Sequence, residues 1–77
     1  MSDGGRRLRN VRIEQAISAF RRMGYEVVRV RGSHYIMKHP EKGMLVLPFH
    51  RGTVKAGIML DALKKAGLSV AEFEELV

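Results

Sequence analysis

A stripe of apolar residues near the N-terminus sets the strictest limit on how this chain folds. It has the i, i+3, i+4, i+7 spacing of one helical face, at Ile13, Ala16, Ile17, Phe20 and Met23. The spacing predicts a helix over about residues 11–23, with Asn10 as the cap at its start and Gly24 as the stop after its last turn. A helix with one apolar face is marginal alone in water, so it requires another apolar surface to pack against.

Three strand-like segments follow this helix. Residues 25–31 and 34–39 contain β-branched and aromatic side chains, and residues 44–47 are all apolar. Gly32-Ser33 and residues 40–43 are turns, and Pro48 ends the third strand because proline has no N–H for the ladder. In the second strand, alternation places Tyr35 and Met37 on one side and His34, Ile36 and Lys38 on the other. The short turns predict an antiparallel meander.

Two further helices are predicted in the C-terminal third. Residues 50–56 are interpreted as a short basic loop, with Gly57 as a weak helix cap. A second helical stripe, closed by Gly67, comprises Met59, Ala62, Leu63 and Ala66. A short third helix over about residues 70–76 is indicated by a capping box, Ser69 with Glu72, and by a hydrophobic staple, Leu68 with Phe73.

The order of these elements predicts an α+β fold: α-β-β-β-α with a short C-terminal helix. Both main helices should cover one face of the three-stranded antiparallel sheet, since neither stripe can be buried alone. Double-stranded-RNA-binding domains have this layout, and they recognise RNA through shape and phosphate contacts. In a chain of 77 residues we expect a flexible basic leader, residues 1–10, and a single domain, residues 11–77.

Composition excludes several kinds of protein. The chain has no cysteine, so disulfides and thiolate metal sites are ruled out, and a reducing cytoplasm is the expected location. The N-terminal charges are not followed by the apolar segment of a signal peptide, and no apolar run is long enough to cross a bilayer. We therefore expect no membrane association.

The net charge of +6 is unevenly distributed. Residues 21–55 carry eight Lys and Arg side chains against Glu26 and Glu41, whereas the C-terminus is mildly acidic. A basic segment in a small domain favours a polyanion as partner, with phosphate contacts providing most of the affinity. A surface that is basic only for solubility is the alternative.

The best candidate for chemistry is His34, directly after the Gly32-Ser33 turn. A histidine at the rim of a sheet can reach a ligand, and imidazole titrates near neutral pH, as general acid–base catalysis requires. A turn histidine without any chemical role is the alternative. Candidate RNA-binding residues surround it: Arg29, Arg31, Ser33, Lys38, His50, Arg51 and Lys55.

Two other kinds of site are disfavoured. His34 and His39 lie five residues apart on one predicted strand and therefore point to opposite faces, and no paired carboxylates accompany them, so we expect no metal site. Ser33 precedes His34, but no acidic residue is placed to orient that histidine for serine catalysis. We expect no small-molecule cofactor. Phe20, Tyr25 and Phe73 are interpreted as core residues rather than stacking platforms, since each lies on an apolar stripe.

Four segments in order resemble the HicA family of small toxins, over about residues 11–76. They are the run from Gly24 to His34, Leu47-Pro48-Phe49-His50, the segment from Lys55 to Leu68, and the acidic segment from Ser69 to Phe73. Two positions depart from the common family pattern. Tyr35 replaces a second histidine, and Gly57-Ile58-Met59 replaces Gly-Thr-Leu, which removes a hydroxyl that could cap a helix or hold a phosphate.

The resemblance implies a function that the residues alone do not establish. It implies a metal-independent mRNA endoribonuclease, neutralised by a HicB-type antitoxin, with the double-stranded-RNA-binding type of fold and with His34 as the catalytic residue. A non-catalytic RNA-binding module of the same fold is the main alternative, and a protein-interaction domain with an acidic partner is another. His50 is the nearest candidate for a complementary acid, but the favoured interpretation is a loop histidine that only contacts phosphate or antitoxin.

Overall fold

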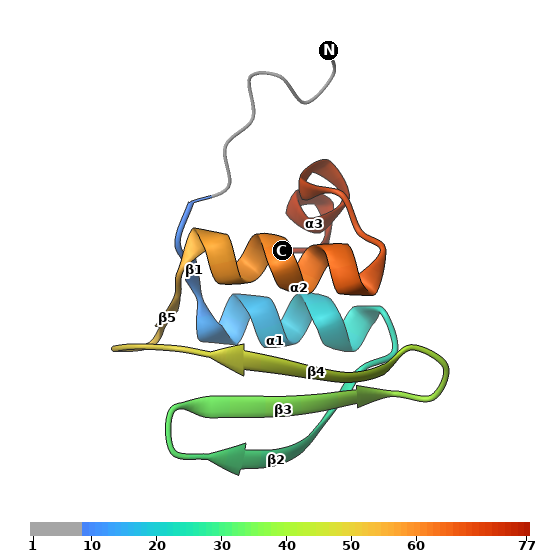
Figure 1. Ribbon diagram of the computed structural model, residues 1–77. Helices are drawn as coiled ribbons and strands as arrows, with labels where there is room; N and C mark the ends of the chain where they lie inside the picture. The colour runs from blue at the N-terminus through green and yellow to red at the C-terminus, as the bar shows by residue number, and fades with distance from the viewer. Residues whose placement is uncertain (1–8) are drawn as a thin grey trace.

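The computed structural model describes residues 9–77, so most of the expected leader, residues 1–8, lies outside the described residues. The elements are β1 (Val11–Arg12), α1 (Ile13–Arg22), β2 (Glu26–Arg31), β3 (His34–His39), β4 (Gly43–Pro48), β5 (Thr53–Val54), α2 (Ala56–Ala66) and α3 (Val70–Leu76). The strands β2, β3 and β4 form an antiparallel meander in that order, and β1 pairs with β5 in a separate small sheet. Figure 1 shows α1 and α2 on one side of the meander. The expected α+β architecture, of the double-stranded-RNA-binding type, is confirmed.

The core lies between the helices and the inner face of the sheet. Met37, Leu45 and Leu47 reach it from β3 and β4, and the predicted helical stripes supply Phe20, Met59 and Leu63. The ring centroids of Phe20 and Tyr25 lie 5.6 Å apart in an edge-to-face contact. Phe20, Tyr25 and Phe73 are all buried, which confirms that they are core residues. Burial also raises the pKa of the Tyr25 hydroxyl above its ordinary value.

The short third helix forms as its capping signal predicts. The backbone N–H of Glu72 donates to the Ser69 hydroxyl at 3.0 Å, and the Ser69 N–H donates to the Glu72 carboxylate at 2.9 Å. Phe73 is buried and Leu68 packs against the same core. Helix α3 thereby contacts both α1 and α2.

Several expectations about local structure are wrong. Residues 11–12 belong to a strand, because they pair with residues 53–54, which were expected to lie in a loop. Asn10 caps a different helix from the one expected: its side-chain oxygen accepts a hydrogen bond from the N–H of Ala56, at the start of α2. The N-cap of α2 is Lys55, so Gly57 lies inside the helix. These pairings join segments more than 40 residues apart, and local sequence carries no signal for them.

His39 has a structural role on the inner side of the sheet. Its Nδ1 atom accepts hydrogen bonds from the N–H groups of Glu41 and Lys42, at 3.0 and 3.1 Å. Its Nε2 atom lies 3.1 Å from the carbonyl oxygen of Met23, to which it donates when Nδ1 acts as acceptor. The ring also contacts Tyr25, with centroids 5.0 Å apart. Both nitrogens are engaged, so His39 joins the end of α1 to the β3–β4 turn.

Candidate active site

His34 is the first residue of β3 and its side chain is exposed. It follows a two-residue turn in which Gly32 has a positive φ of 56°. Glycine at the first turn position is the pattern of a type II′ hairpin, whose twist matches that of the flanking strands. Met37 on the same strand is buried against the helices, and residues three apart on a strand point to opposite faces. His34 therefore projects from the outer face, away from the helices.

A β-bulge in β2 brings arginines onto this face. The register is Val27 opposite Met37, then Arg29 opposite Ile36 and Arg31 opposite His34, with a shift between Val27 and Arg29. Strict alternation from the buried Tyr25 would place Arg29 and Arg31 on the helix side of the sheet. The extra residue, Val28, reverses that alternation. Both arginines consequently share the outer face with His34.

The segment after β4 approaches the same end of the sheet. The N–H of Phe49 donates to the carbonyl oxygen of Ser33 at 2.9 Å, which extends the β3–β4 ladder past its last pair, His34 and Pro48. His50 and Thr53 then close a two-residue turn through hydrogen bonds of 2.8 and 3.0 Å. The turn residues, Arg51 and Gly52, have φ values of 53° and 78°. Ser33 and His50 thus lie at the same end of the sheet as His34, and Arg51 follows His50 in the turn.

Lys55 is connected to this group through a small pocket. The pocket holds about 140 Å³ and is lined by Pro48, Phe49, His50, Thr53, Lys55 and Ile58. Lys55 is exposed at the N-cap of α2, where backbone N–H groups add positive potential. The pocket therefore places the cationic start of α2 beside His50.

Lys38 is the candidate that the structure leaves apart from His34. It lies on the outer face, but four residues along β3, which is about 13 Å in a strand. Its cross-strand partners are Glu26 and Met44. The Glu26 carboxylate reduces the positive potential at Lys38. Because of its distance from His34, Lys38 can contact only a more distant part of a bound polyanion.

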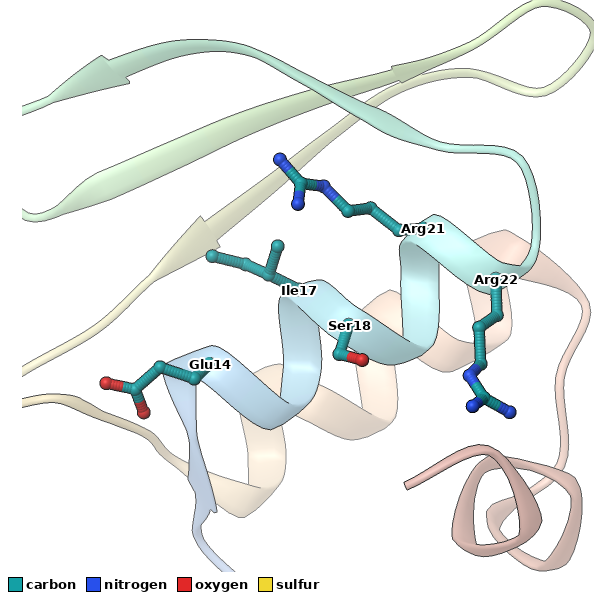
Figure 2. Close-up of a pocket in the computed structure, with 5 residues that line it drawn as sticks. All are labelled: Glu14, Ile17, Ser18, Arg21 and Arg22. Carbon is teal, nitrogen blue, oxygen red and sulfur yellow. The ribbon is translucent and has the colours of Figure 1, made fainter.

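A larger depression lies elsewhere, on α1. Its volume is about 480 Å³, and it is lined by Glu14, Ile17, Ser18, Arg21 and Arg22. Figure 2 shows Arg21 extending toward the sheet and Arg22 extending the opposite way. All five residues belong to one helix, and none of them is a nucleophile or base with a partner positioned for chemistry. We therefore place the candidate site at the rim of the sheet rather than here.

The two departures from the family pattern have separate consequences. Tyr35 lies on the inner face, half-buried, with its ring centroid 5.3 Å from that of Phe49. Tyr35 thus replaces the second histidine of the family pattern at a position that packs against Phe49, on the side of the sheet away from His34. Ile58 is half-buried and lines the pocket beside Lys55. Ile58 thus replaces the threonine of the family pattern, and its hydroxyl, close to the candidate RNA-binding residues His50 and Lys55.

The potential of the site for metal binding is limited by its side chains. Within residues 9–77, no group of three His, Asp or Glu side chains is close enough together to hold an ion. His39 is further excluded as a ligand because both of its ring nitrogens are in hydrogen bonds.

Sequence reasoning named the candidate residues but missed what positions them. The bulge at Val28 has no local signal, because the residues around it are an ordinary β-branched run. The β1–β5 pairing and the Asn10 contact depend on the tertiary fold. Only the Arg51-Gly52 dipeptide carried a usable signal, since glycine after a polar residue is typical of a type I′ turn.

Comparison with known proteins supports the resemblance noted from the motifs. No curated protein matches the chain. Every helix within residues 9–77 is too short or too polar to span a membrane. The family model described as the HicA toxin of bacterial toxin–antitoxin matches residues 13–68, which run from the start of α1 to just beyond α2 and include all three strands of the meander. The chain therefore belongs to the HicA toxin family.

Proposed function

We propose that this protein is a metal-independent endoribonuclease that cleaves mRNA, with His34 as general acid or base. One observation carries the proposal: His34 is exposed at the rim of a cationic sheet face, directly opposite Arg31. RNA contains its own nucleophile, the 2′-hydroxyl, so cleavage requires proton transfer and stabilisation of phosphate charge. One histidine with neighbouring cations can supply both.

The cations around His34 bind the RNA backbone in this proposal. Arg29 and Arg31 lie on the same face as His34, Arg51 follows His50 in the β4–β5 turn, and Lys55 shares a pocket with His50. Ser33 and His50 donate hydrogen bonds to phosphate, and Lys38 contacts the RNA further along the strand. The proposed catalytic domain comprises residues 11–77, with residues 1–10 as a basic leader.

A toxin of this kind has an antitoxin partner, and we propose a protein of the HicB type. Its task is to cover the outer face around His34 and so keep RNA away. An acidic partner is favoured because this face carries Arg29 and Arg31. We place the toxin in the cytoplasm, where mRNA is found.

The alternative is a non-catalytic RNA-binding module. One observation favours it: among residues 9–77, no side chain donates or accepts a hydrogen bond that orients the His34 imidazole. The deciding experiment compares the purified protein with its His34→Ala variant on a long single-stranded RNA, with chelator present. Under the nuclease proposal, the substitution abolishes cleavage and leaves RNA affinity nearly unchanged. Binding without cleavage by the unmodified protein supports the alternative.

A further inference from the structure

Two histidines lie at the same end of the sheet. The direct cross-strand partner of His34 is Pro48, and the ladder continues one residue further through the hydrogen bond from Phe49 to Ser33. His50 is thus the diagonal neighbour of His34, two residues beyond its direct partner. Diagonal neighbours in an antiparallel ladder are about 7–8 Å apart, within reach of long or aromatic side chains.

The packing of Phe49 determines the side on which His50 emerges. The Phe49 ring contacts Tyr35, with centroids 5.3 Å apart, and Tyr35 lies on the inner face of the sheet. Side chains alternate along a strand, so the residues on either side of Phe49 point to the outer face. His50 is one of those residues. It is exposed, as His34 is, and both imidazoles are therefore on the same side of the sheet.

The backbone that carries His50 is held in place. Two hydrogen bonds with Thr53, of 2.8 and 3.0 Å, close its turn, and the next residue, Val54, is completely buried. The turn keeps Arg51 at φ 53°, a left-handed conformation that costs a non-glycine residue about 1–2 kcal/mol. Such strain persists only where the surrounding structure imposes it. A fixed backbone is what a residue that must meet a reacting atom requires.

The charges around the two histidines favour an anion between them. Arg29 and Arg31 share the outer face with His34, Arg51 follows His50 in its turn, and Lys55 lines a pocket together with His50. Among the described residues, the carboxylate that the register puts on this face is Glu26, opposite Lys38 at the other end of the sheet. Glu26 therefore does not compete with a phosphate for the space between His34 and His50.

We propose that His50 is the second catalytic residue, with His34 as general base and His50 as general acid; the inference rests on the proposed RNA cleavage. His34 removes the proton from the 2′-hydroxyl, whose oxygen forms a bond to the adjacent phosphorus. The bond from phosphorus to the 5′-oxygen breaks, and His50 gives its proton to that leaving oxygen. The products are a 2′,3′-cyclic phosphate and a 5′-hydroxyl, and a proton exchange with water restores both imidazoles.

The test uses an RNA oligonucleotide in which sulfur replaces the 5′-bridging oxygen at a mapped cleavage position. A thiolate leaves without being protonated, so this substrate needs no general acid. On ordinary RNA we expect His50→Ala to lower the cleavage rate by about 10²–10⁴-fold, and on the sulfur-substituted RNA to come within about tenfold of the unmodified protein. His34→Ala should lose activity on both substrates, because the base is still required.

A matched variant separates an acid from a phosphate contact. His50→Lys keeps a cationic donor but is a poor acid at neutral pH, so it should behave like His50→Ala on both substrates. Circular dichroism and thermal unfolding confirm that each variant is folded. Equal losses on both RNAs for His50→Ala, or full activity of His50→Lys on ordinary RNA, would overturn the proposed acid while leaving the nuclease intact. Failure of the unmodified protein to cut either RNA would overturn the nuclease proposal itself, and the acid with it.

Discussion

Arg31 lies directly opposite His34 in the β2–β3 ladder, on the face that the helices leave uncovered. The β-bulge at Val28 produces this relationship by reversing the alternation that begins at the buried Tyr25. A guanidinium and an imidazole on facing strands can engage one phosphate, the first by charge-assisted hydrogen bonds and the second by proton transfer. The position of Arg31 is therefore as important to the proposed chemistry as the position of His34.

Substitution of Arg31 should reduce cleavage more than substitution of Lys38. A charge-stabilising donor in an enclosed site is worth about 10²–10³ in kcat, and solvent screening reduces this, so we expect a loss of about 10-fold for Arg31→Ala. Lys38 lies more than a screening length of about 8–10 Å from His34. For Lys38→Ala we therefore expect the cleavage rate to fall by less than about threefold. Single-turnover cleavage rates at 0.15 M salt give the comparison. Equal losses for the two variants would argue against a special role for Arg31.

Arg51 should lower the stability of the fold and strengthen the binding of RNA. Asparagine tolerates the left-handed conformation and is favoured at this turn position, so Arg51→Asn should raise the free energy of unfolding by roughly 0.5–1 kcal/mol. The same variant should bind RNA more weakly, with a less steep dependence on salt, because one phosphate contact is lost. Urea unfolding and a salt titration of RNA binding measure the two effects. Unchanged RNA affinity would show that Arg51 does not contact the backbone.

Much of the fold follows from local signals, and the site only partly does. The glycine turns, the alternation in β3 and the capping box of α3 each involve neighbouring residues, and they were predictable from the sequence. The bulge at Val28 and the contact between Asn10 and Ala56 depend on how distant segments meet. The residue types pointed to His34 and its cations, but only the register placed Arg31 directly opposite His34 and Lys38 at the other end of the strand.

Two glycines should respond oppositely to replacement by alanine. Gly24 has a φ of 103°, and an added Cβ would lie 3.0 Å from the His39 Nε2 atom, which is bound to Met23. We expect Gly24→Ala to lower the free energy of unfolding by more than about 1 kcal/mol. Gly57 lies within α2, and an added Cβ there would meet no other atom. Gly57→Ala should therefore raise the free energy of unfolding by roughly 0.5–1 kcal/mol. Chemical denaturation tests both, and a stable Gly24→Ala would contradict the packing around His39.

The ionisation of Tyr25 should limit stability at high pH. Burial raises the folded-state pKa of its hydroxyl above the ordinary value of 10.0, so the unfolded chain loses this proton first as pH rises. The contribution of this hydroxyl to the free energy of unfolding is complete below pH 10 and is lost as the pH rises through the pKa of the folded state. The free energy of unfolding of Tyr25→Phe should therefore fall less between about pH 9 and pH 11 than that of the unmodified protein. The prediction concerns this pH dependence and not the stability of the two proteins at about pH 7. Parallel pH profiles for the two proteins would contradict this.

The most direct test of the proposed function is the chemistry of the RNA ends that the purified protein leaves in the presence of chelator. Attack by the 2′-hydroxyl leaves a 2′,3′-cyclic phosphate on one fragment and a 5′-hydroxyl on the other. We expect those ends from the unmodified protein and intact RNA from His34→Ala. Fragments that end in a 3′-hydroxyl and a 5′-phosphate, or equal cleavage by the His34→Ala variant, would contradict the proposal that His34 drives a metal-independent cleavage.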